Sequence, residues 1–218
     1  MRLFSSWRRR VAAIGLAVAG AAAGLVAATP AQAQTGCSDV HVVFARGSGE
    51  LPGLGIVGTP FVDSLRSQLR GKSVSVYPVN YLADLLQTSA GAGATDMTRN
   101  VRSVAQRCPN TQFVIGGYSQ GASVTDIAIG IPTVLGIGET IPRELAPRVA
   151  AVVVFGNPLR LFGQTIPRAS QLYGSKAFDD CNFGDPVCAG GVNALAHLTY
   201  GIDGSTTEGA RFAAARIR

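Results

Sequence analysis

Five residues in the middle of the chain have the types and spacing expected of a nucleophilic serine. The pentapeptide Gly117-Tyr118-Ser119-Gln120-Gly121 follows a run of β-branched and aromatic residues and precedes a helix-compatible segment. A serine at the tip of a tight strand-to-helix turn has a strained backbone, so the positions two before and two after it must lack bulk. Such a turn also directs the backbone N–H of Gln120 toward a developing oxyanion. The alternative, a glycine-rich turn with an incidental serine, is disfavoured by the flanking strand and helix patterns.

A serine hydroxyl is a poor nucleophile until a base removes its proton, and the base works best when a third group fixes its tautomer. In folds with this turn, the order along the chain is serine, acid, histidine. Only His197 follows Ser119, so we predict that His197 is the base. His41 lies inside a strand pattern, and we interpret it as a packed residue.

Charge and the N-terminal segment indicate an exported protein. The 218 residues carry 19 Lys and Arg against 13 Asp and Glu, but four of the arginines lie in the first ten residues. Residues 1–33 have a basic start, an apolar run over Val11–Ala28 and a small-x-small cleavage site, which together predict a secretory signal peptide. An uncleaved membrane anchor is the alternative, and the arginines also allow a twin-arginine export route.

The remaining domain, residues 34–218, is nearly neutral, which removes the compositional support for nucleic-acid binding. Its four cysteines are an even number in an exported chain, which predicts two disulfides with three possible pairings. Cys181 and Cys188 are close enough to close a small loop, which leaves Cys37 with Cys108. A metal site is disfavoured because the chain has two histidines and no C-x-x-C spacing.

The predicted acid follows the late apolar strand expected over 149–155. The acids between that strand and the histidine are Asp179, Asp180 and Asp185. Asp185 lies in the loop that a Cys181–Cys188 bridge would close over eight residues. By chain entropy this bridge contributes about 2.5 kcal/mol, against about 4.4 kcal/mol for a bridge from Cys37 to Cys108. The small bridge is better explained as holding a functional loop in place. We therefore predict that Asp185 is the acid that orients the histidine, with Asp180 as the alternative.

The elements that position these residues alternate between strand and helix. Strand patterns are expected over 39–45, 73–79, 112–116, 149–155 and 170–178, and helix patterns over 60–70, 96–107, 120–130 and from 205 onward. This alternation predicts an α/β fold in which helices cover both faces of a parallel sheet.

Two loops are candidates for contact with a substrate. The glycine-rich turn Arg46–Glu50 follows the first strand, where loops of a parallel sheet form the ligand crevice, so Ser48 could offer its hydroxyl and N–H to an oxyanion. A plain turn is the alternative. Leu82, Leu85 and Leu86 lie in a loop expected over 80–94. They could line a crevice or pack on the core.

Together, the pentapeptide around Ser119, the Cys181…Asp185…Cys188 loop, His197-Leu198-Thr199-Tyr200-Gly201 and Arg46-Gly47-Ser48-Gly49-Glu50 resemble the cutinase family. The resemblance runs from Cys37 to the C-terminal helix and is strongest to actinobacterial, mycobacterial-type members. It implies an α/β-hydrolase fold, a three-layer sandwich around a mainly parallel sheet. It assigns Ser119 as nucleophile, His197 as base, Asp185 as acid, and Ser48 and Gln120 as the oxyanion hole, with disulfides Cys37–Cys108 and Cys181–Cys188, no metal and no cofactor. The chain differs from fungal members at Gly49, where a threonine is common.

The function that this resemblance implies is a secreted serine esterase, located outside the cell or in its envelope. It would hydrolyse carboxylic esters of short- to medium-chain fatty acids, including lipids or polyesters, through an acyl-enzyme. The implied partner is an ester or lipid substrate and not a nucleic acid. The mature form is expected to be a monomer without a stable membrane span. The alternatives are a deacetylase of the acetylxylan type and a non-catalytic secreted protein that binds lipid or a protein partner.

Overall fold

The computed structural model describes residues 36–218, so the predicted signal peptide over residues 1–33 lies outside the described part. Five strands form one sheet in the order β2-β1-β3-β4-β5, and every neighbouring pair is parallel. They are β1 (Val40–Ala45), β2 (Val74–Pro78), β3 (Gln112–Tyr118), β4 (Val149–Phe155) and β5 (Ala177–Asp180). Four strands match their predicted positions. The fifth is shorter and later than predicted, because residues 174–176 form a 3₁₀ turn before it.

Six α-helices and three 3₁₀ helices connect and cover the strands. The α-helices are α1 (Gly55–Gln68), α2 (Ala90–Arg107), α3 (Gln120–Ala128), α4 (Ile166–Ala169), α5 (Ala194–Leu198) and α6 (Ser205–Ala214). The 3₁₀ helices are η1 (Arg143–Arg148), η2 (Pro158–Phe162) and η3 (Gly174–Lys176). All counts refer to residues 36–218.

Two helices begin earlier than the sequence patterns predict. Helix α1 starts at Gly55, because the Glu50 carboxylate accepts the Ile56 N–H at 2.7 Å and so satisfies a first-turn donor that would otherwise be unpaired. Helix α2 starts at Ala90, and its early glycines are buried and not part of a loop. A Cβ at Gly91 would lie 2.1 Å from the carbonyl oxygen of Ile137, so this glycine permits close packing between α2 and the 136–138 segment.

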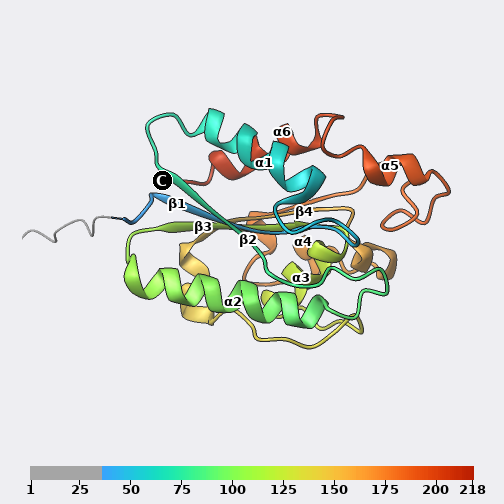
Figure 1. Cartoon of the computed structure of the whole chain (residues 1–218), viewed down its shortest axis with the longest axis horizontal. Coiled ribbons are helices and arrows are strands. Elements are labelled where there is room, and N and C mark those ends of the chain that lie inside the picture. Colours follow the sequence, from blue (N-terminus) through green and yellow to red (C-terminus); the bar gives the residue numbers. More distant parts are fainter. Residues whose placement is uncertain (1–35) are drawn as a thin grey trace, which may run out of the picture. The chain divides into compact units, whose positions relative to one another are not determined.

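The helices form two layers around the sheet, which confirms the predicted three-layer α/β architecture. Helices α1 and α6 cover one face, and α2 and α3 cover the other (Figure 1). Strand β1 shows how the sequence produces this arrangement. Its Val42 and Phe44 pack with α1 and α6, whereas Val43 and Ala45 pack with α2 and α3, as the two-residue period of a strand requires.

The parallel arrangement brings several loops to one edge of the sheet. The turns after β1 and β3, the segment after β5 and helix α5 all lie at the carboxyl ends of the strands, toward the right of Figure 1. This is the edge at which open α/β sheets bind ligands. At the start of β1, the Cys37–Cys108 disulfide ties the chain to the end of α2. No helix among the described residues is long and apolar enough to cross a membrane.

Candidate active site

The turn between β3 and α3 holds Ser119 in the conformation that its flanking glycines predict. Ser119 has φ 55° and ψ −118°, a left-handed value that a non-glycine residue adopts only under constraint. A Cβ at Gly117 would lie 2.0 Å from the carbonyl oxygen of Gly121, and one at Gly121 would lie 1.9 Å from that of Ala45. The Ser119 N–H donates to the Phe155 carbonyl at 2.9 Å, which fixes the turn to β4.

The structure brings the three predicted polar side chains into one hydrogen-bonded row. The Nε2 atom of His197 lies 2.9 Å from Ser119 Oγ, and its Nδ1 atom lies 2.8 Å from Asp185 Oδ2. Asp185 is fully buried and the His197 side chain is 14% exposed. The alternative acid, Asp180, ends β5, and burial raises the pKa of its carboxyl group. Asp185, and not Asp180, contacts the imidazole.

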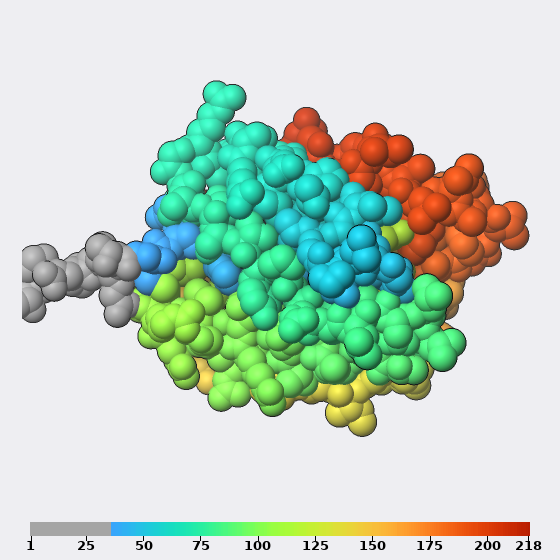
Figure 2. Space-filling model, in the orientation of Figure 1, coloured from blue at the N-terminus to red at the C-terminus, as the bar shows by residue number. Residues whose placement is uncertain are grey.

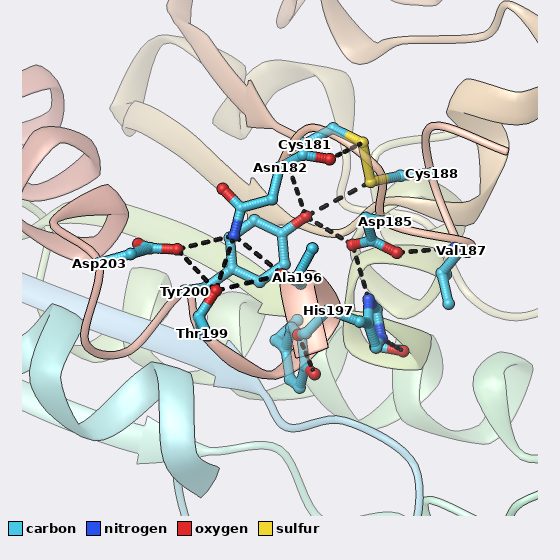
Figure 3. A network of polar contacts seen from close by, with 12 residues as sticks. Cys181, Asn182, Asp185, Val187, Cys188, Ala196, His197, Thr199, Tyr200 and Asp203 are labelled. Carbon is cyan, nitrogen blue, oxygen red and sulfur yellow. Dashed lines mark hydrogen bonds and ion pairs between the residues drawn. A yellow bond between two sulfur atoms is a disulfide. The ribbon is translucent and has the colours of Figure 1, made fainter. Parts of the chain in front are cut away.

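The segment that carries Asp185 is closed by the Cys181–Cys188 disulfide (Figure 3). Within it, the Asp185 N–H donates to the Asn182 carbonyl at 3.1 Å, and the Val187 N–H donates to Asp185 Oδ1 at 2.7 Å. The bridge and these two bonds leave the carboxylate little freedom to rotate. We refer to residues 181–193 as the acid loop.

Helix α5, which no sequence pattern predicted, presents His197 next to the acid loop. The Asn182 amide Nδ2 donates to the Ala196 carbonyl at 2.9 Å, to Thr199 Oγ1 at 3.2 Å and to Asp203 Oδ2 at 2.7 Å (Figure 3). One side chain of the acid loop thus ties down both ends of the segment that carries the imidazole. No sequence pattern predicted a role for Asn182, and its place beside a cysteine was the only available signal.

Two tyrosines that the sequence analysis also left without a role contact the histidine and the acid. The Tyr118 hydroxyl donates to the His197 carbonyl at 2.6 Å, and its ring lies 5.0 Å from the imidazole, centroid to centroid. Burial raises the pKa of Tyr118, with smaller effects of Glu50 and Asp185, so the hydroxyl remains a donor. The Tyr200 hydroxyl donates to Asp185 Oδ2 at 2.7 Å (Figure 3). The positions of both within the motifs, beside the serine and three residues after the histidine, were the available signal.

Ser48 and Gln120 face each other across the opposite side of the site. The Ser48 hydroxyl donates to Gln120 Oε1 at 3.2 Å, and Gln120 Nε2 donates to Ser89 Oγ at 3.3 Å. Gln120 is the first residue of α3, so its backbone N–H has no acceptor within the helix. The geometry therefore brings together both residues predicted to bind an oxyanion, with the Ser48 hydroxyl turned toward the glutamine side chain.

The turn that carries Ser48 is held by its own end residues. The Glu50 carboxylate accepts the Gly47 N–H at 2.5 Å as well as the Ile56 N–H. The buried Arg46 guanidinium donates to the Glu50 carbonyl at 2.8 Å and to the Tyr81 carbonyl at 2.7 Å. These bonds explain why charged residues flank a glycine-rich turn.

Exposed apolar side chains project from the loops and the short helix α5 on both sides of the site, and we call this set the apolar rim. It consists of Leu51, Leu82, Leu85 and Leu86 on one side and Phe183, Val192, Leu195 and Leu198 on the other, each more than half exposed. Figure 2 shows the blue-green segments and the orange-red segments that carry the two sides, separated by a small yellow-green area of the chain. The three leucines at 82, 85 and 86 are exposed and do not pack on the core, so the core-packing alternative is wrong.

Two of the groups weighed in the sequence analysis have other roles. His41 is buried in β1, where its ring nitrogens contact Ser75 Oγ at 2.7 Å and Asn100 Oδ1 at 2.9 Å. Among the described residues, one cluster has metal-ligand spacing, namely Cys181, Asp185 and Cys188. Its two sulfur atoms are bonded to each other, and both oxygens of its carboxylate accept hydrogen bonds, so this cluster has no ligand atoms to spare.

This chain is similar to several known proteins. A cutinase from Kineococcus radiotolerans is 58% identical over 184 residues, which are 84% of this chain and 63% of that protein. The chain thus spans less than two thirds of that relative. The phospholipase Culp4 of Mycobacterium tuberculosis is 42% identical, with 96% of this chain and 92% of that protein aligned. Among solved structures, an acetylxylan esterase at 0.90 Å resolution matches with a TM-score of 0.72 and 25% identity, covering 84% of this chain and all of that one.

The family model named Cutinase matches residues 36–217, which is nearly the whole described chain. Together with the parallel sheet, the strained serine turn and the disulfide-closed acid loop, this match shows that the chain belongs to the cutinase family.

Proposed function

We propose that this protein is a secreted serine esterase that hydrolyses carboxylic esters through an acyl-enzyme. The observation that carries the proposal is the row Ser119 Oγ, His197 and Asp185, joined at 2.9 Å and 2.8 Å. A hydroxyl bonded to an imidazole whose other nitrogen faces a buried carboxylate is the arrangement that activates a serine.

In the proposed mechanism Ser119 attacks the ester carbonyl while His197 Nε2 accepts its proton. The carbonyl oxygen becomes an oxyanion, which the N–H groups of Ser48 and Gln120 and the Ser48 hydroxyl stabilise. His197 then returns the proton to the leaving alcohol, and a water molecule activated by the same imidazole releases the acid. Asp185 holds the imidazole tautomer throughout, since its Oδ2 atom faces Nδ1.

The apolar rim supports acyl esters with chains of several carbons as the substrate class. Leu85 lies against the turn that carries Ser48, because a Cβ added at Gly49 would be 3.1 Å from Leu85 Cδ2. Leu195 and Leu198 lie on the same helix as His197. An acyl chain attached to a carbonyl at Ser119 would then have apolar surface on both sides, which favours it over a bare acetyl group.

A carbohydrate deacetylase is the second candidate, because the acetylxylan esterase shares the fold over the full length of its chain. The relatives reported above are named for a polyester, a phospholipid and an acetylated polysaccharide, so the family does not by itself identify the ester. The preferred acyl-chain length separates these candidates, since we expect a deacetylase to prefer the two-carbon acyl group.

We also propose that residues 1–33 act as an export signal and that residues 34–218 act outside the cytoplasm as a monomer. The two disulfides support an oxidising compartment, where such bonds persist. The basic start, apolar run and small-x-small site of the first 33 residues support cleavage after Ala33.

The test is hydrolysis of nitrophenyl esters with acyl chains of two to sixteen carbons by residues 34–218 with both disulfides formed. We expect kcat/KM to be highest for four to eight carbons. Ser119→Ala should lose on the order of 10⁵–10⁶ in kcat. The control is Ser123→Ala, which changes a buried serine one turn further along α3 and should retain wild-type activity.

Activity confined to the acetyl ester would support the deacetylase instead. An absence of hydrolysis by the folded, oxidised protein would contradict the esterase proposal and favour a non-catalytic binding protein.

A further inference from the structure

The acid of the proposed site has an additional hydrogen-bond donor, the hydroxyl of Tyr200. Tyr200 is fully buried, and its ring lies 6.0 Å from the rings of both Tyr118 and Phe155, centroid to centroid. Its hydroxyl is 2.7 Å from Asp185 Oδ2, the same oxygen that faces His197 (Figure 3). This oxygen therefore contacts two side chains, one of which belongs to the proposed catalytic row.

The direction of the Tyr200 bond follows from its neighbours. The backbone N–H of Asn182, which can only donate, lies 2.9 Å from the Tyr200 hydroxyl oxygen. The phenol must therefore accept at that contact, and its single proton is free to point at the carboxylate. Burial and the hydrogen bond to Asp185 both raise the pKa of Tyr200, so the phenol keeps this proton. The sulfur of Cys188, at 3.4 Å, is a much weaker competing acceptor.

The Asp185 carboxylate needs these donors because it is completely buried. A buried carboxylate that lacks hydrogen bonds is costly and takes up a proton instead. Oδ1 accepts the Val187 N–H and Oδ2 accepts the Tyr200 hydroxyl, which leaves the outward face of Oδ2 for His197. Two donors on different oxygens fix the plane of the carboxylate, and one of them is a side chain that can be removed without changing the backbone.

We propose that Tyr200 is a positioning residue, which orients the Asp185 carboxylate toward His197 through its hydroxyl. The proposal rests on the esterase function proposed above. Tyr200 does not contact the reacting atoms, so its contribution to the rate passes through Asp185. The structure offers a matched control in Tyr173, which is equally buried but whose hydroxyl makes no hydrogen bond within the described residues.

The first test is a double-mutant cycle on ester hydrolysis. Tyr200→Phe should lower kcat by about 10- to 100-fold with little change in KM, the effect of one hydrogen bond to a charged group. In an Asp185→Asn background, the same change should cost less than about threefold, because the residue through which it acts has already been altered. Tyr173→Phe should leave kcat and KM unchanged in both backgrounds.

An equal loss of kcat in both backgrounds would mean that Tyr200 supports the fold and not the acid, and would overturn the proposal. Wild-type activity in Tyr200→Phe would also overturn it. If the wild-type protein hydrolyses no ester, the proposed function fails and this inference fails with it. An equal loss in both backgrounds, or full activity in Tyr200→Phe, would overturn the role of Tyr200 while the wild-type protein still hydrolyses esters. Failure of this inference can therefore be distinguished from failure of the proposed function.

A second test needs no variant and no activity. The labile protons of Tyr200 and His197 Nδ1 both point at Asp185 Oδ2, so they must lie close together. NMR of the wild-type protein at low temperature should show a nuclear Overhauser effect between a slowly exchanging tyrosine hydroxyl and the low-field histidine proton. A Tyr200 hydroxyl that exchanges as fast as an exposed phenol and shows no such effect would overturn the proposal, even if Tyr200→Phe failed to fold.

Discussion

Ser119 and its two partners are held in place by different kinds of interaction. The serine lies on a turn fixed by backbone packing, where a Cβ at Gly121 would lie 1.9 Å from the Ala45 carbonyl oxygen. His197 lies on the short helix α5 and Asp185 lies on an irregular loop, and a disulfide and side-chain hydrogen bonds hold these two segments in place. The serine turn is therefore inseparable from the sheet, whereas the other side of the site can be loosened while the sheet stays folded. This difference predicts which substitutions unfold the protein and which only slow it.

The largest effect is expected on the serine side. Gly121→Ala places a methyl group against the backbone of β1, and the free energy of unfolding should fall by at least about 4 kcal/mol, because backbone atoms cannot move aside cheaply. The control is Gly163→Ala, where φ is 70° and no atom lies within 4 Å. It should cost only the left-handed strain of about 1–2 kcal/mol. Urea unfolding of both variants measures the difference, and equal losses would remove the packing explanation.

The two disulfides should separate stability from activity. Changing Cys37 and Cys108 to serine opens the longer loop and should lower the free energy of unfolding by about 4.4 kcal/mol, with kcat of the folded protein unchanged. Changing Cys181 and Cys188 to serine should cost only about 2.5 kcal/mol but should lower kcat, because Asp185 lies between them. Urea unfolding and single-turnover kinetics check the pair. If the loss of kcat were proportional to the loss of stability in both double variants, the Cys181–Cys188 bridge would have no separate role in positioning Asp185.

Ser48→Ala tests the oxyanion side, which is held by backbone and side chain together. Loss of one oxyanion donor should lower kcat on the order of 10²–10³-fold. Because the hydroxyl donates to Gln120 Oε1 in the structure, it must turn toward the substrate during the reaction. The control is Ser67→Ala, an exposed serine on α1, which should be neutral. A loss below about threefold for Ser48→Ala would mean that only backbone N–H groups bind the oxyanion.

The smallest effect concerns a second buried acid, Asp126 on α3. Neither of its oxygens has a hydrogen-bond partner within the described residues. Burial, and secondarily the Asp179 charge, raises the pKa of Asp126. Because the pKa of Asp126 is higher in the folded than in the unfolded state, the protonated carboxyl group contributes stability. This contribution is fully present below the unfolded pKa of about 3.9 and is lost as the pH rises through the folded pKa.

Asp126→Asn should therefore stabilise the protein more at pH 7 than at pH 4, by about 1–2 kcal/mol, because the amide stays neutral at both. Thermal unfolding across this range measures the effect. A difference that does not change with pH would show that folding does not raise the pKa of Asp126, and would contradict this prediction.

The sequence alone predicted the serine turn well, because steric rules act over a few consecutive residues. Gly117, Ser119 and Gly121 lie within five positions, and the backbone that they require is local. The order of strands and helices followed from periodicity in the same way. Asp185 and His197 were reached by elimination and by the cysteine spacing, and the structure places both beside Ser119.

The supporting side chains could not be found in this way. Asn182, Tyr118 and Tyr200 contact groups 14 to 79 residues away, so their positions in or beside the motifs do not reveal which groups they hold. The starts of α1 and α2 were also missed. The start of α1 depends on the Glu50 carboxylate, which comes from the preceding turn. The start of α2 depends on close packing at Gly91, and its glycine-rich sequence resembles that of a flexible loop.

The central claim is that Ser119 is a nucleophile activated by a histidine that the acid loop holds in place. The most direct measurement is labelling of oxidised residues 34–218 with a fluorophosphonate, followed by peptide mapping. The account predicts one label per molecule, on Ser119, and slow labelling in His197→Asn, because the serine then has no base. A folded protein that takes up no label, or takes it up at another residue, would contradict the account.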